Sequence, residues 1–98
     1  MKKKYTLLLD PQAFDDIQNA IDYYNMQQKD LGKRFHKTVK NAFDVIKNNP
    51  MFQIRYDNIR CLPLKPFPYM IHYSVDDNII NARVVINTYK NPDNSRVK

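Results

Sequence analysis

The chain has 98 residues, of which 43% are hydrophobic and 12% aromatic, enough for one domain with a single modest core and too few for two. Its net charge of +6 favours an acidic partner, either nucleic acid or an acidic protein. The single cysteine excludes an internal disulfide framework and suits a reducing cytoplasm. The apolar run near the N-terminus is too short for the core of a signal peptide or for a membrane span. We therefore expect a soluble cytoplasmic protein.

The N-terminal half is predicted to form a strand and two helices. Residues 4–9 form the strand, and Asp10 and Pro11 suit the cap and the first turn of a helix that runs to about residue 28. A break at 30–32 precedes a second helix, which ends before Pro50. Apolar residues with helical spacing form one stripe on each helix: Ala13, Phe14, Ile17, Ala20, Ile21 and Tyr24, then Phe35, Val39, Ala42, Phe43 and Ile46. The short connection predicts an antiparallel helical hairpin.

The two predicted helices carry opposite charge. Residues 11–28 hold three Asp and no Lys or Arg, whereas residues 29–48 hold six basic residues against two Asp. A charged helix face is by default a solvated surface. The alternative is a docking surface for an acidic partner, made by Lys33, Arg34, Lys37 and Lys40.

The C-terminal half is predicted to form a sheet. Residues 51–58 are a connector with a short extended piece at 53–56, and two strands, 59–65 and 69–75, flank a proline-rich turn. A turn at 76–78 leads to the longest strand, 79–88. Alternation predicts that one face meets the core, with Leu62, Leu64, Tyr69, Ile71, Tyr73, Val75, Ile80, Ala82, Val84 and Ile86. The other face, left open to bind something, carries Cys61, Pro63, Lys65, Met70, His72, Ser74, Asn81, Arg83, Val85 and Asn87.

The element order is therefore β-α-α-β-β-β. It predicts an α+β domain in which the helical hairpin packs on one face of a small, mainly antiparallel sheet. We expect a single domain over residues 1–98, with a polar tail over about 91–98.

Several short segments identify a family through their joint order and spacing. They are Ile21-Asp-Tyr-Tyr24, Leu31-Gly-Lys-Arg-Phe35, Asn49-Pro50, Ile54-Arg-Tyr56, Arg60-Cys-Leu-Pro-Leu-Lys65, Phe67-Pro-Tyr69, Ile71-His-Tyr73 and Thr88-Tyr-Lys-Asn-Pro92. Together they resemble the RelE/ParE toxin superfamily over nearly the whole chain, from residue 4 to residue 92. The resemblance implies the toxin of a bacterial type II toxin–antitoxin pair of the plasmid-stabilisation kind. It also implies a small acidic antitoxin that neutralises the toxin, in a complex that can be a hetero-oligomer.

Two activities occur in this superfamily on one fold, so the fold alone does not choose between them. The RelE branch cuts messenger RNA on the ribosome with Lys and Arg on the open sheet face, and the ParE branch inhibits DNA gyrase. When the chain is aligned with the nucleases by Tyr69 and Tyr73, the positions that hold Lys or Arg in the nucleases are occupied here by Cys61, Pro63 and Met70. None of these three side chains can hold a phosphate. We therefore expect a ParE-like toxin that acts by binding rather than as an enzyme.

Two alternatives remain beside this reading. One is a ribosome-dependent endoribonuclease of RelE type, for which the remaining catalytic candidates are Lys65, Arg83, Tyr89 and Lys90, with His72 as an acid–base group. The other is a degenerate toxin that keeps only antitoxin binding. In the ParE-like reading, the resemblance implies target contacts near the C-terminus, at Thr88, Tyr89 and Lys90.

The sequence predicts no cofactor, no metal and no membrane partner. The two histidines and Cys61 lie far apart without ligand spacing, and the only glycine, Gly32, excludes a glycine-rich phosphate loop. A lone cysteine or a histidine within an aromatic strand is more often a packing residue, and this is the default reading for Cys61 and His72.

Overall fold

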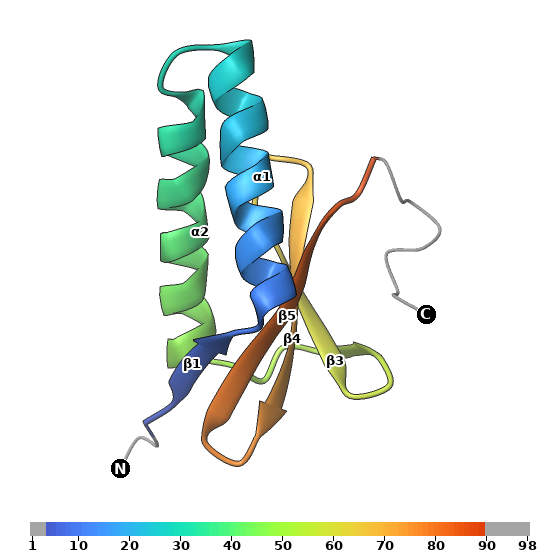
Figure 1. Cartoon of the computed structure of the whole chain (residues 1–98). Coiled ribbons are helices and arrows are strands. Elements are labelled where there is room, and N and C mark those ends of the chain that lie inside the picture. The colour runs from blue at the N-terminus through green and yellow to red at the C-terminus, as the bar shows by residue number, and fades with distance from the viewer. Residues whose placement is uncertain (1–3, 90–98) are drawn as a thin grey trace.

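The structure is a computed structural model that describes residues 4–89 (Figure 1). In chain order its elements are β1 (Thr6–Leu9), α1 (Pro11–Gln27), α2 (Leu31–Asn48), β2 (Ile54–Tyr56), β3 (Ile59–Pro63), β4 (Tyr69–Asp76) and β5 (Ile79–Asn87). The sheet order is β1-β5-β4-β3-β2, in which β1 pairs parallel to β5 and the other pairs are antiparallel. The predicted α+β class is confirmed, with β2 as one strand more than the predicted order. The predicted tail lies outside the described residues.

The two helices form an antiparallel hairpin that covers one face of the sheet (Figure 1). Their predicted stripes meet the sheet as expected, because Phe35 and Ile46 of α2 are fully buried against a core that includes Ile71 and Tyr73 of β4. Full burial of such a side chain contributes about 1.5–3 kcal/mol. No helix in the described part of the chain combines the length and apolarity that a membrane crossing needs.

Gly32 allows the two helices to approach closely where the hairpin turns. The backbone nitrogen of Gly32 donates to Oδ1 of Asn25 at 2.9 Å. A Cβ atom at position 32 would lie 2.5 Å from that oxygen and 2.5 Å from the carbonyl oxygen of Ile21. Only glycine fits this contact without a shift of the backbone.

The start of α1 differs in detail from the sequence prediction. Asp10 occupies the N-cap position, and its carbonyl accepts from the amide of Phe14 at 3.1 Å, but its carboxylate makes no capping bond. That carboxylate instead pairs with the guanidinium of Arg83 on β5 at 3.1 Å. Further along α1, Oδ2 of Asp16 accepts from the backbone nitrogen of Val85 at 3.0 Å. The first helix is therefore tied to β5 beyond the end of β1.

A β-bulge changes which side of β5 faces the core. His72 pairs with Val84 and the next residue of β4 pairs with Ala82, so Arg83 is an extra residue in the strand. One inserted residue reverses the alternation that follows it. Val85 is consequently buried in the core, and the prediction that Val84 and Ile86 face the core is wrong.

Candidate functional site

The centre of the sheet face opposite the helices is covered rather than open. His72 is 1% exposed, and Nδ1 of its ring is 2.9 Å from the hydroxyl of Tyr56 on β2. Ser74 is also buried, and its hydroxyl oxygen accepts from Nε of Arg83 at 3.1 Å. The expectation that this face is free to bind a ligand is therefore wrong for its centre, because side chains of β2 and β5 lie over it.

Cys61 and His72 lie directly opposite each other on β3 and β4, a proximity that the sequence analysis did not anticipate. Burial raises the pKa of the Cys61 thiol to about 11, although the charge of Arg55 acts in the opposite direction. Burial, aided by Arg55, lowers the pKa of His72 to about 4. A thiol that stays protonated beside a neutral imidazole is not an activated nucleophile. The packing reading of both residues is favoured.

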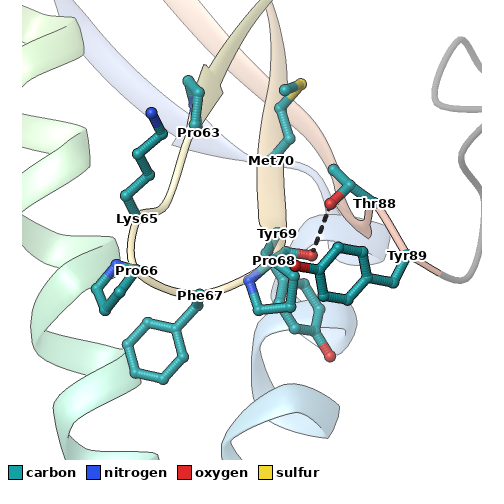
Figure 2. A pocket seen from close by; sticks show the side chains of 9 residues that line it. All are labelled: Pro63, Lys65, Pro66, Phe67, Pro68, Tyr69, Met70, Thr88 and Tyr89. Atoms are coloured by element: carbon teal, nitrogen blue, oxygen red, sulfur yellow. Dashed lines mark hydrogen bonds between the residues drawn. The ribbon is translucent and has the colours of Figure 1, made fainter.

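A pocket of about 620 Å³ lies between the β3–β4 connection and the end of β5. This turn pocket, drawn in Figure 2, is lined by Pro63, Lys65, Pro66, Phe67, Pro68, Tyr69, Met70, Thr88 and Tyr89. Both the backbone nitrogen and the hydroxyl of Thr88 donate to the carbonyl oxygen of Pro68, at 2.8 and 3.2 Å. These two bonds hold the end of β5 against the turn.

The turn pocket brings together some of the predicted site residues and not others. Lys65, Thr88 and Tyr89 share it, with Lys65 on the β3 side and Tyr89 on the β5 side (Figure 2). Arg83 is not among its lining residues, because its side chain is bound to Asp10 and Ser74. Lys90 lies outside the described residues. The sequence analysis noted Pro63 and Met70 only as missing cations, whereas the structure makes them walls of a pocket.

The predicted docking residues of α2 line a second, more polar surface. Lys33, Arg34, Lys37 and Lys40, together with His36 and Asn41, border a groove of about 460 Å³, which we call the basic groove. All six side chains are exposed. The cations therefore stand side by side on one helix face, and the potential that they create is positive.

An apolar groove runs beside the basic groove, between the two helices. This inter-helix groove, of about 150 Å³, is lined by Leu9, Phe14, Ile17, Gln18, Ile21, His36, Val39, Lys40 and Phe43, so it shares His36 and Lys40 with the basic groove. Phe14 is 57% exposed although it belongs to the predicted core stripe of α1. The apolar stripe of α1 is wider than the part of the helix that the sheet covers. In the sequence, this excess width was the feature that could have indicated an apolar binding surface. Leu9 connects the groove to β1, which is an edge strand of the sheet.

Comparisons with known proteins match most of the chain. Residues 7–87 match the sequence model of a family described as the ParE toxin of the type II toxin–antitoxin system parDE. A chromosomal ParDE toxin–antitoxin structure from P. aeruginosa aligns with a TM-score of 0.76 and 12% identity, over 86% of this chain and 96% of that one. A DinJ–YafQ toxin–antitoxin complex from E. coli aligns with a TM-score of 0.61 and 13% identity, over 90% and 97%.

YafQ from E. coli strain BL21(DE3) has a TM-score of 0.59 and 14% identity, over 89% of this chain and 97% of that chain. No curated protein sequence matches the chain. Identities this low establish a shared fold, and the fold is common to both kinds of neighbour.

Proposed function

We propose, from the premise that the chain belongs to the ParE toxin family of type II toxin–antitoxin systems, that this toxin acts by binding DNA gyrase rather than by cutting RNA. The proposal rests on the three residues that occupy the positions where RelE-type nucleases carry Lys or Arg. Cys61 is buried with a raised pKa, and Pro63 and Met70 are apolar walls of the turn pocket. None of the three can stabilise the charge that develops on a phosphate during cleavage. Such a toxin works in the cytoplasm, where its target is.

The arrangement of the alternative catalytic residues also supports binding. RNA cleavage requires a base for the 2′-hydroxyl, a cation at the phosphate and an acid for the leaving oxygen, all within reach of one another. Arg83, the arginine among the candidates, donates to Asp10 and Ser74 instead of joining Lys65 and Tyr89 at the turn pocket. Within residues 4–89, the candidates that remain at the pocket are one lysine and one phenol, an incomplete set for this chemistry.

A pair of parallel assays tests the target. Purified toxin is added to a gyrase supercoiling reaction and, separately, to a ribosome-containing extract that translates a labelled messenger RNA. We expect supercoiling to be inhibited and the messenger RNA to stay intact. Cleavage of the messenger RNA in register with codons, while gyrase is unaffected, would contradict the proposal. Loss of both effects would favour a degenerate toxin that keeps only antitoxin binding.

The target contacts are proposed at the end of β5, on Thr88, Tyr89 and Lys90. Tyr89 is 81% exposed, so its ring is available to a partner. Truncation of the chain after Asn87 removes all three residues but leaves the helical hairpin and the five strands complete. We expect this truncated protein to lose toxicity while it still binds the antitoxin. Equal loss of the two properties would argue that the truncation acts on the fold.

The antitoxin is proposed to cover the helical hairpin and the edge of the sheet at β1. The basic groove, with Lys33, Arg34, Lys37 and Lys40, offers positive charge to an acidic protein, and the adjoining inter-helix groove offers apolar surface to a helix. The outer edge of β1 presents backbone groups that an extended segment of a partner can pair with. Charge, apolar groove and strand edge lie next to one another, so a single antitoxin chain can reach all three.

A matched pair of charge reversals tests the basic groove. Lys37→Glu changes a residue of the groove, and Lys47→Glu makes the same charge change in the last turn of α2, outside it. The partner in the assay is the product of the neighbouring gene. We expect Lys37→Glu to slow association by about twofold to fivefold, the equivalent of about 0.5–1 kcal/mol for an exposed pair, and to weaken the dependence on salt. Identical kinetics for the two variants would place the antitoxin elsewhere.

A further inference from the structure

We propose that the turn pocket takes up an apolar side chain of the target protein, while Lys65 pairs with a carboxylate next to that side chain. The inference rests on the proposed function, because the partner is the target of a toxin that acts by binding. It adds a specific anchor: a segment of a protein with an aliphatic or aromatic residue beside an acidic one.

The walls of the turn pocket are apolar and held in place. Pro66 and Pro68 restrict the backbone of the β3–β4 connection, and Pro63 restricts that of the last residue of β3, because each proline ring fixes its own φ. Backbone bonds close the connection, since the amide of Leu64 donates to the carbonyl of Tyr69 at 2.9 Å and the amide of Tyr69 donates to Phe67 at 2.8 Å. A site that is already ordered loses little entropy when a partner binds.

Phe67, one of the lining residues, packs against the helical hairpin. The ring of Phe67 lies 5.0 Å from that of Tyr24 on α1 and 5.1 Å from that of Phe35 on α2, measured between ring centroids. Phe35 is fully buried. The β3–β4 connection is therefore anchored to the core through Phe67.

The charge of the lining selects the kind of ligand. Among the nine described residues that line the pocket, Lys65 is the only one with a charge, and none is acidic. One ammonium group suits one carboxylate. A nucleic acid strand is held by several phosphate contacts from Lys and Arg, and the lining within residues 4–89 offers a single one. Met70 adds a flexible, polarizable wall that adapts to the shape of an apolar side chain.

Exposed apolar side chains extend the surface beyond the pocket. Tyr23, whose ring lies 5.3 Å from that of Tyr24, is exposed near the end of α1, and Met26 in the last turn of that helix is 86% exposed. Figure 1 shows the β3–β4 connection level with the middle of α1 and the last turn of the helix beyond it, and the ring of Tyr24, next to Tyr23, contacts that of Phe67 in the connection. Aromatic residues and methionine are enriched at the centre of protein interfaces, where a few of them carry most of the affinity. Tyr23 thus places an exposed aromatic ring next to the helix residue on which the β3–β4 connection packs.

Inhibition of purified gyrase by the full chain tests the inference. Lys65→Glu and Tyr89→Ala change the rim of the pocket, Lys65→Arg keeps its charge, and Lys47→Glu is the control for net charge. We expect Lys65→Glu and Tyr89→Ala each to raise the concentration for half-inhibition about tenfold, as truncation of an anchor residue does. Lys47→Glu is expected to inhibit as the unchanged protein does, and Lys65→Arg, which keeps the charge, to lose less inhibition than Lys65→Glu. Affinity for the antitoxin, measured in parallel, should stay the same in all four variants and thereby shows that they fold.

The outcomes separate this inference from the function on which it rests. If the unchanged chain inhibits gyrase and the Lys65→Glu and Tyr89→Ala variants inhibit equally well, the pocket is not the docking site although the function stands. If the unchanged chain does not inhibit gyrase, the proposed function is wrong and the docking site is wrong with it. If a fluorescent single-stranded RNA binds the chain and loses affinity in the same two variants, the pocket is a nucleic-acid site and the inference is overturned.

Discussion

Acidification from pH 7 to pH 5 is expected to destabilise the protein through His72. The ring is 1% exposed, and its Nε2 atom has no hydrogen-bond partner within residues 4–89. Protonation would place a charged N–H group there without an acceptor, in the field of Arg55. These conditions, burial first, lower the pKa of His72 to about 4 from its ordinary value of 6.5. The imidazole therefore stays neutral in the folded protein at pH 5, whereas it is mostly protonated in the unfolded chain.

The sign and the size of the effect follow from this difference in pKa. Between pH 6.5 and pH 4 the unfolded state binds more protons than the folded state, so the free energy of unfolding falls as the pH falls. The contribution is fully present above pH 6.5. With a folded pKa of about 4, the loss between pH 7 and pH 5 is about 2 kcal/mol, and it approaches about 3 kcal/mol below pH 4. Domains are commonly stable by about 5–15 kcal/mol, so the loss is large enough to measure.

Urea unfolding at pH 7, 6 and 5, followed by circular dichroism, measures this loss. Two variants separate the contribution of His72 from that of the other titrating groups in this window. His72→Gln removes the titrating group, and His36→Gln removes the exposed histidine as a control. We expect the wild type and the control to lose about 2 kcal/mol between pH 7 and pH 5, and His72→Gln to lose much less. An equal loss in His72→Gln would refute the reasoning.

Three further substitutions test contacts that hold the fold. Gly32→Ala is expected to lower the free energy of unfolding, measured in urea, by about 1–3 kcal/mol. The reason is that the added methyl group would lie 2.5 Å from a carbonyl oxygen of the facing helix. A gain in stability would show that the helices can separate there. Tyr73→Phe removes the hydroxyl that donates to the carbonyl of Pro50 at 2.8 Å and should cost about 1–2 kcal/mol in the same assay, whereas no change would mean that water replaces it. Asp16→Ala leaves the amide of Val85 without its acceptor. We therefore expect faster hydrogen exchange at that amide and a free energy of unfolding that is lower by about 1–3 kcal/mol. Unchanged exchange would contradict the contact.

Local features of the sequence predicted the helices, the class of fold and the family. Phe35, Val39, Ala42 and Ile46 recur with helical spacing, and all four are buried in the structure. Pro11 opens the first helix, and the second ends at residue 48, just before Asn49 and Pro50, as the sequence indicates. These signals involve residues within one or two turns of each other, so they can be read without knowing the rest of the chain. The family follows from the joint order of such segments, and the match over residues 7–87 confirms it.

The tertiary structure alone decided which predicted site residues meet. The bulge at Arg83 reverses the alternation of β5, and an unpaired residue in a strand has no periodic signal. Tyr56 reaches His72 across the sheet from a strand of three residues, which turns an apparently open position into a buried one. The turn pocket likewise joins the β3–β4 connection to Thr88, about 20 residues further along the chain. Each of these contacts depends on the register between strands, and the packing of the whole domain sets that register. The sequence could therefore name the residues, but it could not show which of them lie in contact.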